Sequence, residues 1–132
     1  MWHLSPIDER GLLARRHSHS AFREARVPAA SRSVIEGAVA QVFGVGQSEI
    51  ALSTRGRAPA AEARQVAMYL AHVALGITMR DVGSLFSRDR TTVAHACGVI
   101  EDRRDDPVFD RALELLEWTV IALLFPRRLA AA

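Results

Sequence analysis

The chain contains no lysine, and all 17 of its basic residues are arginine. It has a single cysteine, Cys97, which excludes an intrachain disulfide and a cysteine-cluster zinc site. Its longest apolar run, Val120 to Phe125, is much shorter than the roughly 20 residues that a transmembrane helix needs. The first residues lack the apolar stretch of a secretory signal peptide. These absences predict a cytoplasmic protein without a membrane segment.

The chain length and the distribution of charge indicate one domain with a polyanionic partner. The 132 residues are enough for a single hydrophobic core. The net charge is only +2, but residues 54–95 carry six arginines against three acidic residues. Residues 101–117 carry seven acidic residues against three arginines. A basic middle followed by an acidic tail points to a negatively charged partner for the middle.

Residues 1–31 form an irregular segment with two prolines and the mixed run Arg15 to Ser20. We expect a flexible basic arm here, ahead of a domain over residues 32–126 and a short tail over residues 127–132. Two interpretations of the arm stay open. It is either a solvated tail or a basic segment that contacts nucleic acid or another protein. His17 and His19 are too few and too isolated to predict a metal site.

The first predicted helix covers Ser33–Phe43, where apolar residues recur at three- and four-residue spacing. Ser33 is the expected N-cap, with Glu36 completing a capping box. Gly44 and Gly46 follow the helix and are expected to end it.

A short helical turn is expected over Gln47–Leu52, with Ile50 and Leu52 facing the core. The polar and basic residues 53–59 then predict a loop.

The clearest helical pattern runs over Glu62–Leu75, and Gly76 is expected to end that helix. Its predicted apolar stripe consists of Val66, Met68, Tyr69, Leu70, Val73 and Ala74. Thr78 is positioned to cap the next helix, which reaches Phe86, with Asp81 at the capping-box position.

A tight turn over residues 87–89 predicts a helix-turn-helix. Asp89 is expected to cap the following helix, Arg90–Asp102, and Pro107 to open a last helix over Val108–Phe125. The sequence has no internal repeat and no alternating run typical of a strand. The predicted fold class is therefore all-α.

The helix over Arg90–Asp102 has two different faces. Its inner side is expected to consist of Val93, Ala96, Cys97 and Ile100. Its outer side carries Arg90, Thr91, Ala94, His95 and Gly98, a mixture of small and hydrogen-bonding residues. Such a surface, next to an electropositive helix N-terminus, suits a recognition helix in the DNA major groove.

Two long motifs resemble the C-terminal DNA-binding domain of the bacterial replication initiator DnaA. They are Ala63-Arg64-Gln65-Val66-Ala67-Met68-Tyr69-Leu70-Ala71 and Arg88-Asp89-Arg90-Thr91-Thr92-Val93-Ala94-His95-Ala96-Cys97. Their order and separation also fit that family, and the resemblance covers roughly residues 33–116. The sequence contains no GxxxxGK[ST] loop, so it resembles a stand-alone DNA-binding domain without the family's ATPase part.

The resemblance implies a small Trp-repressor-like helix-turn-helix domain that binds double-stranded DNA. By position, Asp89, Arg90 and Thr91 would face base edges in the major groove. The residues that would hold phosphates are Arg64, Gln65, Thr78, Thr92 and His95. Arg57 is the nearest candidate for the family's minor-groove arginine, and Arg88 begins the second motif and joins the predicted DNA-binding set.

Several positions depart from the family's usual pattern. Arg90 stands where the family usually has histidine, and Ser87 stands where it usually has two glycines, which shortens the turn by one residue. Arg80 replaces a common proline. Gly98 and Val99 follow the second motif where the family tends to place basic residues. The family's DNA sequence preference therefore cannot be carried over intact.

No catalytic site, cofactor or metal site is predicted. No serine or cysteine nucleophile can be assembled with a base and an orienting acid from the spacing of these residues. Cys97 is expected to be a small core residue, and His72 a partly buried structural histidine.

The segment Trp118–Phe125 is apolar nearly all round, and such a helix should be buried. It either packs against the helix over Ser33–Phe43 or forms a subunit interface in a homodimer.

Two functional hypotheses follow. The first is a nucleoid-associated protein that prefers initiator-like DNA sites and regulates replication initiation or transcription. The second is an interaction module that mimics the initiator's C-terminal domain and modulates the initiator or its regulatory ATPase partners.

Overall fold

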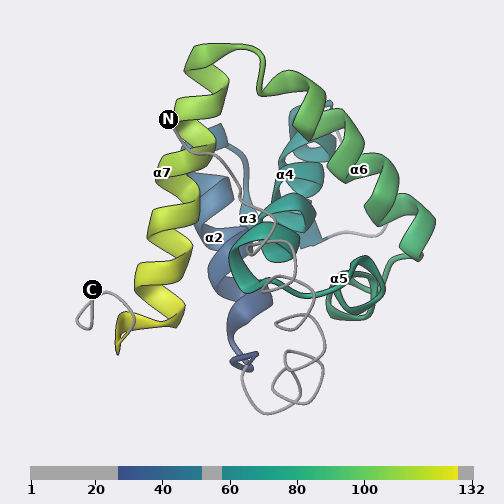
Figure 1. Cartoon of the computed structure of the whole chain (residues 1–132), viewed down its shortest axis with the longest axis vertical. Helices are drawn as coiled ribbons and strands as arrows, with labels where there is room; N and C mark the ends of the chain where they lie inside the picture. Colours follow the sequence, from purple (N-terminus) through teal and green to yellow (C-terminus); the bar gives the residue numbers. More distant parts are fainter. Residues whose placement is uncertain (1–26, 52–57, 128–132) are drawn as a thin grey trace, which may run out of the picture.

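The computed structural model describes residues 27–51 and 58–127 of the chain (Figure 1). Over these two ranges it contains helices and no strand, which confirms the all-α fold class. The helices are α2 (Ser31–Phe43), α3 (Gln47–Ala51), α4 (Ala58–Leu75), α5 (Met79–Phe86), α6 (Arg90–Arg103) and α7 (Pro107–Leu124). In the described part of the chain, none of these helices is long and apolar enough to cross a membrane.

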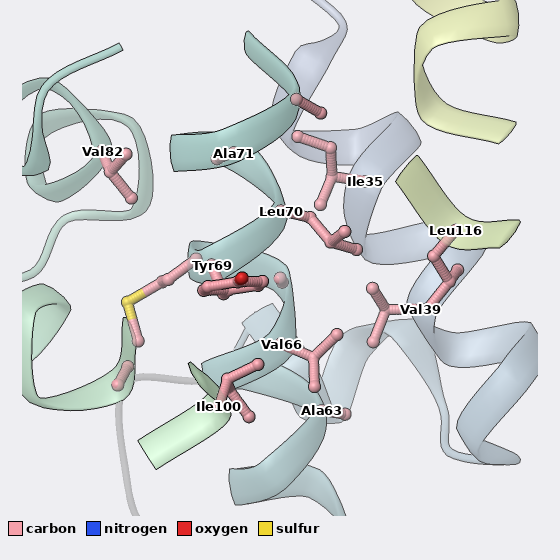
Figure 2. Close-up of a cluster of buried hydrophobic side chains, with 14 of the residues drawn as sticks. Ile35, Val39, Ala63, Val66, Tyr69, Leu70, Ala71, Val82, Ile100 and Leu116 are labelled. Atoms are coloured by element: carbon pink, nitrogen blue, oxygen red, sulfur yellow. The ribbon is translucent and has the colours of Figure 1, made fainter. Parts of the chain in front are cut away.

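The fold is built around α4, which contacts each of the other five described helices. Ten of its 18 residues are buried, because α2 and α7 pack on one side of it and α5 and α6 on another (Figure 1). Figure 2 shows Leu70 of α4 directed towards Ile35 of α2, while Val82 of α5 lies on the opposite side of α4. This central helix separates the helix-turn-helix formed by α5 and α6 from the face formed by α2 and α7.

The start of α2 corrects the predicted capping box. The helix begins at Ser31, two residues earlier than expected, and its N-cap is Ala30, which makes no side-chain capping bond. Glu36 is buried and accepts a 3.3 Å hydrogen bond from Arg32 Nε. Ser33 therefore lies inside the helix, and Glu36 pairs with an arginine on the neighbouring turn.

The start of α4 also differs from the prediction, since the helix begins at Ala58 rather than Glu62. Pro59 lies in its first turn, where the fixed backbone angle of proline fits a helix and its missing N–H has no helical partner to lose. Ile50 is buried as expected, whereas Leu52 lies outside the described residues. Val73 is exposed and does not belong to the buried stripe that we predicted.

The glycines that were expected to end α2 and α4, and two structural residues, agree with the prediction, while α6 and α7 differ from their predicted bounds by one residue. Gly44 and Gly76 follow α2 and α4 in the left-handed conformation. His72 is partly buried, with its Nδ1 atom 2.7 Å from the carbonyl oxygen of Ile77, and Cys97 is buried in the core. His72 thus holds the chain where it leaves α4.

The last helix, α7, buries one stripe and exposes another, so the expectation of burial on all sides is wrong. Leu113, Leu116 and Val120 are buried against the core. Trp118, on the other side, is 62% exposed. The exposed apolar side borders a groove of about 530 Å³ between α2 and α7. The predicted packing of α7 against α2 is therefore confirmed for its buried stripe and not for its exposed side.

Arg104 connects the end of α6 to α4 and α7. Its guanidinium donates to Asp110, to Glu117 Oε1 at 2.8 Å and to the hydroxyl of Tyr69 at 3.1 Å. The Tyr69 hydroxyl in turn donates to the carboxylate of Glu101. This network holds the C-terminal end of α6 in place.

Burial, together with the hydrogen bond to Glu101, raises the pKa of Tyr69 to about 12 from the ordinary value of 10.0. The folded state therefore holds this proton more tightly than the unfolded state. The resulting stabilisation is fully present below pH 10 and is lost as the pH rises through the folded-state pKa. Because the chain has no lysine and only one tyrosine, few other groups titrate in this range.

We predict that the free energy of unfolding of the wild type falls between about pH 10 and pH 12, and that this fall is smaller in Tyr69→Phe. At neutral pH the variant should be less stable by about 1–2 kcal/mol, because a buried hydrogen bond is lost. Urea unfolding at a series of pH values measures both effects. Burial also raises the pKa of Cys97, but this group titrates in both proteins and cancels in the comparison. Parallel pH curves for the two proteins would contradict the prediction.

Candidate nucleic-acid interface

The turn between α5 and α6 is short and tightly hydrogen-bonded. Thr78 caps α5, as predicted, by accepting a 3.2 Å hydrogen bond from the backbone N–H of Asp81. Ser87 ends α5 in the left-handed conformation with a φ of 56°. The backbone N–H of the next residue, Arg88, donates to the carbonyl of Gly83 at 2.8 Å. The chain thus enters α6 directly over the last turn of α5.

Gly83 permits this close approach. A Cβ atom added at this position would lie 2.5 Å from the carbonyl oxygen of Arg88, closer than real Cβ contacts come. The obstructing atom belongs to the backbone, so a rotamer change could not relieve the contact. Gly83 was not among the residues predicted from the sequence to matter here, although a glycine inside a short amphipathic helix signals a packing constraint.

The two faces of α6 are arranged as the sequence predicted. Val93, Ala96, Cys97 and Ile100 are buried against the core. Thr91, Ala94, His95 and Gly98 recur at three- and four-residue spacing and are exposed. The side of α6 that faces away from the core is therefore lined by small and hydrogen-bonding residues.

The N-terminus of α6 presents polar side chains to solvent. Asp89 occupies the N-cap position in extended conformation but makes no side-chain capping bond, in contrast to the expected cap. Its carboxylate and the side chains of Arg90, Thr91 and Thr92 are exposed. These four consecutive residues form the outer edge of the helix-turn-helix.

Comparison with known proteins connects this geometry to a family. A model described as the bacterial dnaA protein helix-turn-helix matches residues 33–100, which include α3 to α5 and most of α2 and α6. The chain belongs to this DnaA helix-turn-helix family.

Three relatives are each named chromosomal replication initiator protein DnaA. The protein from Bartonella quintana is 40% identical over 85 residues, which are 63% of this chain and 17% of the relative. The protein from Symbiobacterium thermophilum is 36% identical over 86 residues, 64% of this chain and 19% of the relative. The protein from Pseudothermotoga lettingae is 38% identical over 64 residues, 48% of this chain and 14% of the relative. The chain thus matches less than a fifth of the length of these DnaA proteins.

Four of the predicted DNA-binding residues of this DnaA-type domain come together around one open hollow of about 580 Å³ between α5 and α6. We call it the α5–α6 hollow. The predicted residues that line it are Arg88, Asp89, Arg90 and Thr92. The lining residues that the prediction missed are Arg80, Gly83, Ser84 and Ser87. Arg80 and Ser84 are four residues apart on one exposed face of α5, a spacing that could have identified them.

Arg64, which belongs to the first family motif, is buried and used within the protein. Its Nε atom donates to the carbonyl of Ile50 at 3.0 Å and its Nη2 atom to the carbonyl of Glu49 at 2.9 Å. Burial and the nearby positive charge of Arg88 lower its pKa from the ordinary value. The side chain holds α3 against α4, and its contact with a phosphate stays a prediction.

The other predicted residues lie outside the α5–α6 hollow. Thr78 and His95 are exposed, and Gln65 is half-buried on α4. Arg57 lies outside the described residues, so its predicted minor-groove contact stays a prediction. Within residues 27–51 and 58–127, no group of three or more histidine, cysteine or acidic residues is placed to hold a metal ion.

We predict that Gly83→Ala lowers the free energy of unfolding by about 1–3 kcal/mol, because the added methyl group collides with the backbone of the turn. Gly98→Ala is the matched control, since apart from its chain neighbours and the backbone of its own helix no atom lies within 4 Å of the added Cβ atom. The control should be neutral or more stable by up to about 1 kcal/mol, because alanine favours a helix over glycine. Urea unfolding measures both variants, and equal stabilities would contradict the close-packed turn.

Proposed function

We propose that the protein binds double-stranded DNA with α6 as the recognition helix in the major groove. The observation that carries this proposal is the first turn of α6, which presents Asp89, Arg90 and Thr91 to solvent within a DnaA-family helix-turn-helix. In helix-turn-helix proteins, the first residues of the second helix contact base edges. The small residues Ala94 and Gly98 leave room for that helix to approach the floor of the groove.

The chemistry of these side chains suits direct readout of base pairs. The guanidinium of Arg90 can bind the O6 and N7 atoms of guanine with two hydrogen bonds. The methyl group of Thr91 can contact the methyl group of thymine, and the carboxylate of Asp89 can accept a hydrogen bond from cytosine N4. Because Arg90 stands where the family usually has histidine, we expect a stronger requirement for guanine at its position.

Phosphate contacts from the surrounding residues would set the register of the helix without reading the sequence. Thr92 and His95 on α6 and Thr78 at the start of α5 are exposed and can donate hydrogen bonds to phosphate oxygens. Gln65 and Arg88 are half-buried and would contribute at the edge of this surface. Arg64 has two nitrogens bonded to carbonyls, so a phosphate contact would use its remaining nitrogen, Nη1.

The biological role that we propose is control of replication initiation or of transcription. The relatives are named chromosomal replication initiators, and a related helix-turn-helix would occupy sites similar to theirs. Occupation of such sites would place the protein at the nucleoid and would change access of other proteins to the same DNA.

We predict that Arg90→Ala and Thr91→Ala each reduce discrimination between a preferred and a scrambled duplex by about 1–3 kcal/mol, the energy of one good base contact. The preferred duplex comes from selection on a randomised library, and titration at fixed salt gives the two dissociation constants. The control is Arg127→Ala, which removes another exposed arginine, one that lies beyond the end of α7. If discrimination is unchanged in the α6 variants, the major-groove assignment is wrong.

A second candidate function is supported by the exposed apolar side of α7. Leu115, Trp118 and Leu123 are all more than half exposed, and Leu115 and Leu123 border the groove between α2 and α7. A protruding tryptophan one turn from an apolar groove suits a two-fold contact, in which the same patch serves on both copies. We infer a homodimer through this face; the alternative, contact with the initiator or a regulatory ATPase, stays a prediction.

We predict that Trp118→Ala weakens self-association by at least about 2 kcal/mol, as a central aromatic residue of an interface does. Sedimentation equilibrium over a range of concentrations measures the dimer dissociation constant. Val108→Ala is the matched control, because Val108 is an exposed apolar residue near the start of α7 and does not border the groove. A wild type that stays monomeric at every concentration would contradict the homodimer.

A further inference from the structure

The α5–α6 hollow is a concentrated site of positive charge. Among its lining residues are three arginines, Arg80 from α5, Arg88 from the turn and Arg90 from α6, and one carboxylate, that of Asp89. The other side chains around it that can form hydrogen bonds are Ser84, Ser87 and Thr92. The hollow thus gathers arginine and hydroxyl donors from two helices and the turn between them.

The arginines of the described residues differ in whether they are paired inside the protein. Five of them bond to acidic side chains or to backbone carbonyls: Arg32, Arg64, Arg103, Arg104 and Arg111. Arg88 also interacts within the protein. In the described part of the chain, Arg80, Arg90 and Arg127 have no such partner, and the first two line the same hollow.

Two unpaired guanidinium groups in one hollow repel each other, so the positive charge of both favours a negatively charged group bound in the hollow, even where only one of them bonds to it. The planar guanidinium binds phosphate with two parallel hydrogen bonds, which distinguishes it from a simple point charge. In the helix-turn-helix arrangement, the first helix crosses the sugar–phosphate backbone while the second enters the groove. Arg80 lies on that first helix, close to its N-terminus.

We infer that Arg80 is a further DNA-contacting residue and that the α5–α6 hollow seats one backbone phosphate of the duplex. Arg80 and Ser84 approach this phosphate from α5, and Thr92 approaches it from α6. Arg90 then extends from the edge of the hollow towards the bases. This inference rests on the proposed DNA-binding function and adds to it a contact that the family motifs do not identify.

The test compares Arg80→Ala, Arg80→Lys and the control Arg127→Ala by titration of the preferred and the scrambled duplex at several salt concentrations. A phosphate contact predicts that Arg80→Ala weakens binding to both duplexes by the same factor. It also predicts that the slope of log K against log salt becomes shallower by about 1. Arg80→Lys keeps the charge, so it should restore the slope and recover part of the affinity. Thermal unfolding of each variant confirms that the exposed substitution leaves the fold intact.

The experiment distinguishes a failure of the phosphate contact at Arg80 from a failure of the proposed DNA binding. If Arg80→Ala binds both duplexes like Arg127→Ala while Arg90→Ala loses discrimination, the hollow holds no phosphate and the proposed function stands. If Arg80→Ala loses discrimination at a particular base pair, Arg80 reads a base, which overturns the phosphate assignment. If the wild type binds no duplex, the proposed function fails and the inference fails with it.

Discussion

The approach of the turn to Gly83 is the constraint on which the candidate interface depends. The carbonyl of Arg88 occupies the space that a side chain at Gly83 would need, so α6 begins directly over the last turn of α5. This placement brings an arginine of α5 and an arginine of α6 to one hollow. The same placement fixes which side of α6 meets the core. A turn of another length would change how these two arginines lie relative to each other.

The sequence was sufficient to predict the faces of α6 but not every helix end. The buried positions of α6 follow from periodicity alone, because a helix in a small domain must direct its only apolar stripe at the core. The starts of α2 and α4 were wrong because several local signals compete at each helix end. Glu36 pairs with Arg32, and Pro59 enters the first turn of α4 instead of ending a loop. Trp118 was expected to be buried, but apolar composition cannot show whether a neighbouring helix is available to cover it.

The role of each arginine could not be predicted from the sequence, because pairing is a tertiary property. Arg64 belongs to a family motif yet bonds to the carbonyls at the end of α3. Arg103 pairs with Glu62 and stacks over the ring of Phe109, while Arg104 joins two carboxylates of α7. Three of the seven acidic residues counted over residues 101–117 form ion pairs, Asp110 and Glu117 with Arg104 and Glu114 with Arg111. Two of the described arginines without a partner, Arg80 and Arg90, lie together near the other end of α6.

These contacts hold α6 at both ends. The turn over Gly83 fixes its N-terminus, and Arg104 fixes its C-terminus through Asp110 and Glu117 of α7. The family match ends at Ile100, so this second attachment comes from a helix outside the matched region. A recognition helix that is held in place before it meets DNA loses little conformational freedom on binding, and its side chains reach base edges in a defined geometry. In this chain, α7 therefore supports the candidate interface by positioning α6 from its opposite end.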